Sequence, residues 1–461
     1  MSYEDFIINK LSSVPATGIN DGTVRVPDSL FPHQKALSTW ALRRGRAAIF
    51  ADTGLGKSRM QLAWSDAVAR YTNQPVLILA PLAVAPQTVN EGRELGIEVK
   101  HCRSGSEADG QRIVITNYDR LHLFNPAAFS GVVLDESSCI KHHNTRTLQM
   151  LLDAFKQTQF KLCATATPAP NDWTELGTHA EFLGVCTRAE MLAEFFTHDG
   201  GDTSVWRLKG HARHVFWRWV SQWGALVRKP SDLGFDGSMY ELPPLHLHEH
   251  TVSTEMPLNG MLFASEAQTL SERRDARRLS VDDRVRECAA IVNADRQPWV
   301  VWCDLNSEGD ALTAAIDGAV QIAGADDVEV KEQRLADFAA GKIRVLVSKP
   351  SICGFGLNWQ HAARMAFVGV TDSFESYYQA VRRCWRFGQT RPVHVHIFAS
   401  SAEGAVVANL KRKERDALAM AESLGAETRD AVMQSVTGTT RQTNAHNATK
   451  RVAIPSFLEA A

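Results

Sequence analysis

The sequence has 461 residues, more than one ordinary hydrophobic core serves, so we expect two or three domains. Hydrophobic residues make up 44% and charged residues 22%, which is typical of a globular protein. A net charge of −2 excludes a global field that draws the protein to nucleic acid or membrane, so any polyanion site must come from local basic clusters.

Cysteine usage and the chain ends narrow the class further. The eight cysteines are scattered and form no Cys-x-x-Cys pair, which predicts reduced, buried thiols and argues against structural zinc. The N-terminus lacks a basic start followed by an apolar core, and no apolar run reaches about 18 residues. We therefore expect a cytoplasmic protein with no membrane partner.

The first part of the chain predicts an α/β domain over residues 31–180, preceded by a lead-in over residues 1–30. A helix is expected from Gln34 to Arg44. Short apolar runs predict strands at residues 47–50, 76–80, 113–116, 132–135 and 161–165, and the segments between them are long enough for helices. This alternation is typical of a parallel sheet covered on both faces.

Residues 181–255 predict a helical insertion and linker between two domains. Within it, residues 206–229 contain no Asp or Glu and place four tryptophans among six basic residues: Trp206, Trp217, Trp219, Trp223, Arg207, Lys209, Arg213, Arg218, Arg228 and Lys229. Two interpretations stay open at equal weight. The tryptophans belong to the core and the arginines to a solvated face, or the strip contacts nucleic-acid phosphates with aromatic stacking and serves as a strand-separating wedge.

The strand that follows carries His246, His248 and His250 at alternate positions, so they share one face. A solvated face is favoured over a metal site.

A second α/β domain is predicted over residues 256–424. Helices are expected at residues 281–295 and 328–340, and strands at residues 299–303, 343–347, 365–370 and 393–398. Residues 425–461 are rich in Thr, Asn, Gln and Ala without apolar periodicity, which predicts a mobile tail. The fold class is therefore two parallel-sheet α/β domains in tandem.

The chemistry is organised around a strand, a glycine-rich loop and a helix near residue 50. Gly54 and Gly56 let the backbone approach a polyphosphate, Lys57 reaches the β- and γ-phosphates, and Ser58 offers a hydroxyl to Mg²⁺. Such a loop needs an acidic partner. The apolar strand ending in Asp135 and Glu136 supplies it, with Asp135 for the metal and Glu136 for the attacking water.

These residues resemble the superfamily 2 helicases, and more closely the SWI/SNF-type double-stranded DNA translocases in a compact bacterial or phage form. The matches run in chain order over roughly four-fifths of the sequence. Those in the first domain are Phe31-Pro32-His33-Gln34, Asp52 to Ser58, Pro81-Leu82-Ala83-Val84, Thr116-Asn117-Tyr118, Asp135-Glu136-Ser137-Ser138 and Thr165-Ala166-Thr167-Pro168. Those in the second domain are Gly354 to Asn358 and Gln379 to Gln389, the latter being the most specific.

The resemblance implies two RecA-like domains, with ATP and Mg²⁺ as cofactors and a role for each matching residue. Lys57, Asp135, Glu136 and the arginine fingers Arg383 and Arg386 would be catalytic. The implied ATP-binding residues are Phe31, Gln34, Asp52, Thr53, Gly54, Leu55, Gly56, Lys57, Ser58, Gly356 and Gln379. Ser58 and Asp135 would hold the metal, and Thr165 and Thr167 would couple hydrolysis to motion. The implied DNA contacts are Pro81, Thr116, Asn117 and Gly354, and Arg218 of the basic strip joins them.

The sequence also departs from the family pattern. Ser138 stands where His or Gln is usual and Arg382 where Asp is usual, so contacts across the cleft are expected to differ.

The implied function is an ATP-dependent translocase or helicase acting on double-stranded or forked DNA, with replication or recombination proteins as further partners. An RNA-directed ATPase and a nucleotide-switched DNA clamp without turnover are the alternatives.

Overall fold

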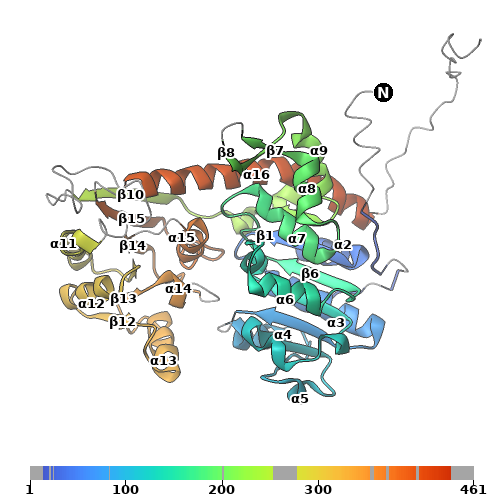
Figure 1. Cartoon of the computed structure of the whole chain (residues 1–461). Helices are drawn as coiled ribbons and strands as arrows, with labels where there is room; N and C mark the ends of the chain where they lie inside the picture. The colour runs from blue at the N-terminus through green and yellow to red at the C-terminus, as the bar shows by residue number, and fades with distance from the viewer. Residues whose placement is uncertain are drawn as a thin grey trace, which may run out of the picture.

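The computed structural model describes residues 14–19, 22–23, 25–81, 84–199, 202–252, 278–353, 358–369, 373–400 and 404–437. It contains two α/β domains, each built on a parallel sheet, and confirms the predicted fold class (Figure 1). No helix in these ranges is long and apolar enough to cross a membrane.

The first domain holds a seven-stranded parallel sheet in the order β3-β4-β2-β5-β6-β1-β9. The strands are β1 (Arg46–Ala51), β2 (Val76–Ala80), β3 (Lys100–His101), β4 (Ile113–Asn117), β5 (Gly131–Asp135), β6 (Phe160–Ala164) and β9 (Gly224–Val227). The helices of its central part are α2 (Pro32–Arg44), α3 (Lys57–Thr72), α4 (Ala85–Glu94), α5 (Gly105–Ala108), α6 (Arg146–Ala154) and α7 (Leu176–Leu183). The five strands predicted here are present within one or two residues of the expected bounds.

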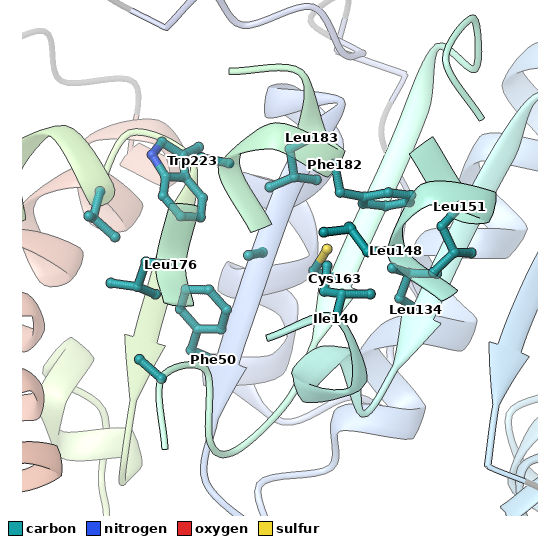
Figure 2. Packing of buried hydrophobic residues seen from close by; sticks show 14 of the residues in the cluster. Phe50, Leu134, Ile140, Leu148, Leu151, Cys163, Leu176, Phe182, Leu183 and Trp223 are labelled. Carbon is teal, nitrogen blue, oxygen red and sulfur yellow. The ribbon is translucent and has the colours of Figure 1, made fainter. Parts of the chain in front are cut away.

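Alternate residues of these strands feed two separate cores, one on each face of the sheet. On β1, Ala47 and Ile49 pack with α2 and α3, whereas Ala48 and Phe50 face α6 and α7. Figure 2 shows the second face, where Phe50, Leu134 and Cys163 of the sheet meet side chains from α6, α7 and the Trp223 region. Burial on both faces explains why the strands read as continuous apolar runs.

The basic and aromatic strip completes the first domain. It lies among α8 (Arg188–Phe195), the antiparallel pair β7 (Phe196–Asp199) and β8 (Asp202–Leu208), and α9 (Arg213–Val220). Trp217, Trp219 and Trp223 are no more than 5% exposed, while Arg218 on the opposite side of α9 is exposed. These three tryptophans are therefore core residues, and the stacking and wedge interpretation is wrong for them.

The boundaries of the insertion differ from those predicted. Strand β9 pairs with β1 and extends the first sheet well beyond residue 180. Strand β10 (Leu245–Val252) pairs with β15 over eight residues and belongs to the second sheet, so the second domain begins before residue 256.

The second domain has a six-stranded parallel sheet in the order β10-β15-β14-β11-β13-β12. Its other strands are β11 (Trp299–Cys303), β12 (Ala319–Ile322), β13 (Val345–Ser348), β14 (Arg364–Val368) and β15 (Val393–Ser400). Its helices are α11 (Val281–Ala294), α12 (Asn306–Ala315), α13 (Val328–Ala339), α14 (Pro350–Cys353) and α15 (Phe374–Val381).

A long helix, α16 (Gly404–Thr437), joins the two domains (Figure 1). Val406 and Leu410 enter the core of the second domain, and Leu424 and Val432 enter the cores of the first. The Thr428 hydroxyl accepts a hydrogen bond of 3.0 Å from the backbone N–H of Leu226. The predicted mobile tail is therefore wrong for residues 425–437, which are helical and packed; residues 438–461 lie outside the described part of the chain.

Candidate active site

The glycine-rich loop leaves the C-terminal end of β1 and enters α3 at Lys57. Gly54 and Gly56 have φ values of +89° and +80°, a region that side chains disfavour. A Cβ atom on Gly56 would lie 2.2 Å from the Gln34 amide nitrogen, and one on Gly54 would lie 2.8 Å from the Cβ of Phe387. Both glycines therefore allow the backbone conformation of the loop and the close approach of a neighbour. The neighbour of Gly56 is Gln34 of the same domain, and the neighbour of Gly54 is Phe387 of the second domain.

Asp135 and Glu136 stand at the end of β5, which is separated from β1 only by β6. Asp135 is held by two contacts: the Gln61 amide donates to its Oδ1 at 2.6 Å, and the Tyr118 hydroxyl donates to its backbone carbonyl at 2.8 Å. Burial, followed by the charge of Glu136, raises the pKa of Asp135 to about 7. A carboxyl group with this pKa suits a site completed by a cation.

Glu136 is positioned by its own backbone and by the predicted coupling motif. Its φ is +51°, in the left-handed region, so the extended backbone of β5 ends at this residue. The Thr165 hydroxyl donates to Glu136 Oε2 at 3.2 Å and accepts from the Thr167 backbone N–H at 3.1 Å. The structure thus brings Thr165 to the carboxylate that the sequence assigns to water activation, and the Thr167 backbone holds the Thr165 hydroxyl.

The second domain supplies arginines to the same cavity. The cavity has a volume of about 180 Å³ and is lined from the first domain by the loop, Asp135 and Glu136, and from the second by Gln379, Arg382, Arg383 and Arg386. Burial, and then the nearby Arg386, lowers the pKa of both Arg382 and Arg383 to about 9. Burial lowers the pKa of Lys57 as well, against the charges of Glu136 and Asp135. Cations crowded in this way favour a polyanionic ligand.

Lys57 and Gln379 have the contacts expected of a site that binds such a ligand. The Lys57 ammonium group donates to the Ala51 carbonyl at 3.0 Å, at the C-terminal end of β1. The Gln379 side-chain nitrogen is buried in the cavity wall and has no hydrogen-bond partner among the described residues. An unpaired buried donor is costly, and a phosphate oxygen would satisfy it.

The predicted nucleotide-reading residues at the start of α2 divide into two kinds. Gln34 is buried and spends both polar groups internally, donating to the Leu55 carbonyl at 3.0 Å and accepting from the Phe31 N–H at 3.1 Å. In this conformation Gln34 supports the loop. Phe31 is 41% exposed and leaves its ring open to a ligand.

The predicted DNA contacts are less well supported. Thr116 is fully buried, so its side chain cannot touch a strand in this conformation. Arg218 is exposed and lines a surface hollow with the basic residues Arg43 and Arg44 and the acidic residues Glu427 and Asp430, far from a purely basic surface. Pro81 and Asn117 lie at the C-terminal ends of β2 and β4. Gly354 and the nucleotide-site residue Gly356 lie outside the described residues.

The sequence did not predict several residues of the site. Gln61 and Tyr118 hold Asp135, and Tyr378 contacts Asp52 from the other domain. Gln61 lies one helical turn after Lys57 on α3, and that spacing was the available signal. Nothing in the sequence indicates the partners of Tyr118 and Tyr378, because both depend on how distant elements pack.

Metal binding by protein residues alone finds no support among the described residues, which contain no group of three or more His, Cys, Asp or Glu that could hold an ion. The alternating histidines of β10 instead form hydrogen bonds with β15: His248 with His394 and His250 with His396, each at 3.0 Å.

A tandem of parallel-sheet domains with a phosphate loop on one and arginines on the other defines a two-domain P-loop ATPase core of the helicase type. Comparison with family models is consistent with this class: an SNF2-related domain matches residues 33–222, and a helicase conserved C-terminal domain matches residues 304–388. The chain therefore carries an SNF2-related domain followed by a helicase conserved C-terminal domain, an order consistent with a compact superfamily 2 helicase of the SWI/SNF type.

Two individual proteins resemble the chain over most of its length. "Putative protein p41" of Acyrthosiphon pisum secondary endosymbiont phage 1 is 23% identical over 455 residues, covering 83% of this chain and 96% of the relative. The Sulfolobus solfataricus SWI2/SNF2 ATPase core, solved in complex with double-stranded DNA, is 16% identical with a TM-score of 0.41; the match covers 88% of this chain and 97% of that one.

Proposed function

We propose that the protein is a DNA-stimulated ATPase that translocates along double-stranded DNA. One observation carries this proposal: Arg383 and Arg386 of the second domain line the same cavity as Lys57 and Glu136 of the first. A cation delivered from a second domain stabilises charge on a transferring phosphoryl group only while the domains are closed, so hydrolysis becomes coupled to domain motion. The match to an SNF2-related domain supports DNA as the track.

The residues fit ATP with Mg²⁺. Ser58 and Asp135 would hold the ion, and two protein oxygen ligands suit Mg²⁺, which keeps water and phosphate oxygens as its other ligands. When bound, the ion neutralises phosphate charge. Glu136 would orient a water molecule and accept its proton, and the hydrogen bond from Thr165 would fix the orientation of that carboxylate.

The test of substrate is an ATPase assay with double-stranded DNA, single-stranded DNA and RNA, run beside triplex-displacement and fork-unwinding assays. We expect the strongest stimulation by double-stranded DNA, displacement of a triplex strand, and affinity that falls with salt. Stimulation by RNA alone would contradict the proposal and favour an RNA-directed ATPase.

Two variants test the reaction itself. Glu136→Gln should lower kcat by roughly 10²- to 10⁴-fold with ATP binding retained, since it removes the proton acceptor. Arg386→Ala should lower stimulated turnover by roughly 10³-fold or more. Arg391→Ala is the matched control, because Arg391 lies on the same segment but is exposed, binds the His361 carbonyl and does not line the cavity. Unchanged turnover in Glu136→Gln would identify a nucleotide-switched clamp instead.

A further inference from the structure

Helix α15 of the second domain is ion-paired to the first domain at both ends. Near its N-terminus, Glu375 pairs with Lys141, which follows the Asp135-Glu136 element, and both side chains are mostly buried. At its C-terminal end Arg382 pairs with Asp52, the first acidic residue of the phosphate loop. The two pairs lie about two helical turns apart and join the same two domains, so they act on one relative orientation.

Asp52 is bound by the second domain through both carboxylate oxygens. The Arg382 guanidinium donates to Oδ2, and the Tyr378 hydroxyl donates to Oδ1. From its own domain Asp52 Oδ1 accepts hydrogen bonds from the backbone N–H of Thr53 at 2.6 Å and from the Thr53 hydroxyl at 3.4 Å. The Arg382 and Asp52 side chains are 6% and 10% exposed, so water screens the pair weakly.

Arg382 is itself held rigidly by α15 and the turn that follows it. Its Nε donates to the Tyr378 hydroxyl at 3.2 Å, and a second nitrogen donates to the Trp385 carbonyl at 3.1 Å. The guanidinium carbon lies 4.7 Å from the centre of the Trp385 ring. A side chain fixed at this many points transmits the position of Asp52 to the backbone around residues 382–386.

That backbone carries the two arginine fingers. Arg383 directly follows Arg382, and Arg386 lies about one turn further on. A buried ion pair adds little net stability compared with apolar packing, but it fixes register, since a misaligned pair leaves an uncompensated buried charge. The contact therefore sets where the fingers stand over the loop.

We propose that Arg382 and Tyr378 are positioning residues that bind Asp52 and so align Arg383 and Arg386 with the phosphate loop. This inference rests on the proposed ATPase function for its kinetic consequence, but the contact between the domains does not. Small displacements of a reacting group can cost about 100-fold in rate, so the expected effect is on kcat rather than on ATP binding.

The kinetic test uses Tyr378→Phe, Arg382→Ala and the charge exchange Asp52→Arg with Arg382→Asp. Tyr378→Phe removes one hydroxyl and should lower DNA-stimulated kcat roughly fivefold, and Arg382→Ala roughly 10- to 100-fold, each with KM for ATP changed less than about threefold. The double variant with exchanged charges should have a kcat at least about tenfold higher than that of the Arg382→Asp single variant. Arg364→Ala is the matched control because its partner Asp295 lies in the same domain, 3.1 Å away, and its kcat should be unchanged. Unchanged kcat in Arg382→Ala, or an exchange no better than the single variant, would overturn the proposal.

A second measurement separates this inference from the ATPase proposal. Without nucleotide, hydrogen exchange should rise in peptides covering residues 46–58 and 374–387 in Tyr378→Phe and Arg382→Ala, and should stay at the wild-type level in Arg364→Ala. If the wild-type protein does not hydrolyse ATP, the ATPase proposal fails while this exchange experiment still decides the contact. Hydrogen exchange at the wild-type level in both Tyr378→Phe and Arg382→Ala would overturn the positioning proposal even if the enzyme is active. Tyr378→Phe also keeps the test valid if Arg382→Ala fails to fold.

Discussion

The C-terminal end of α16 allows a direct test of whether this helix packs against the first domain and stabilises it. Thr428 and Val432 lie beyond the point where the sequence predicted a mobile tail, yet both are fully buried against the first domain. The variant Thr428→Val with Val432→Ala exchanges one hydroxyl acceptor for a methyl group at position 428 and removes two methyl groups at position 432, without shortening the chain. A mobile tail would tolerate both changes, whereas a packed helix would not.

The expected loss follows from the two contacts. Thr428→Val leaves the buried N–H of Leu226 unpaired, which costs about 1–3 kcal/mol. Val432→Ala removes about 1.6 kcal/mol of apolar burial, with a further cost for the cavity. The double variant should therefore be about 3–5 kcal/mol less stable, a large share of a typical domain stability of about 5–15 kcal/mol.

Urea denaturation followed by tryptophan fluorescence measures this loss, because Trp217, Trp219 and Trp223 lie in the first-domain core that α16 joins. Gln434→Ala is the matched control: it lies on the exposed side of the same helix and should change stability by less than about 0.5 kcal/mol. A midpoint for the double variant equal to that of the control would refute the reasoning.

Three further outcomes are expected. Thr165→Val should lower the single-turnover rate constant of ATP hydrolysis roughly tenfold or more, because it removes the hydrogen bond to Glu136, while Thr165→Ser, which keeps the hydroxyl, should stay near the wild-type rate. Burial lowers the pKa of His179 to about 4, so its contribution to stability is present above its unfolded-state value of about 6.5 and is lost as pH falls towards 4; the stability advantage of wild type over His179→Gln, measured by urea titration, should shrink over that interval by at most about 3 kcal/mol. Trp219→Ala should cost about 3–5 kcal/mol of stability in the same denaturation assay, whereas Trp206→Ala at a half-buried position should cost less; a DNA-binding loss in Trp219→Ala at full stability would contradict its assignment to the core.

The strands and the loop were predictable because their signals are local. A strand buried on both faces must be apolar throughout, as at Val76–Ala80 and Trp299–Cys303, and the predicted bounds of these two strands match the structure. The loop needs glycines at fixed positions, and Lys57, Asp135 and Glu136 meet because the parallel strands β1 and β5, with only β6 between them, end at the same edge of the sheet.

Other features could not be read because their partners are distant in sequence. Strand β9 is four residues long, begins with Gly224 and lies at the sheet edge, so its apolar pattern is too short to predict a strand. The buried stripe of α16 beyond residue 420 consists of Leu424, Thr428 and Val432, one residue per turn with a polar member, which hides the helical period. The sequence predicts Gly54 as a loop glycine, but the absence of a side chain there also leaves space for Phe387 of the second domain.

The contacts between the domains bear on how the cleft can open. Opening must separate Asp52 from Arg382 and Tyr378, and Lys141 from Glu375, and it must strain α16, whose Lys413 ammonium group donates to Asn171 at 2.9 Å just after the coupling motif. A single ion pair could break gradually, but contacts attached to rigid helices exchange together, because displacing one helix by an ångström disrupts all of them. We therefore expect the cleft to open as a two-state element rather than as a continuous hinge, with α15 and α16 linking the loop to the second domain.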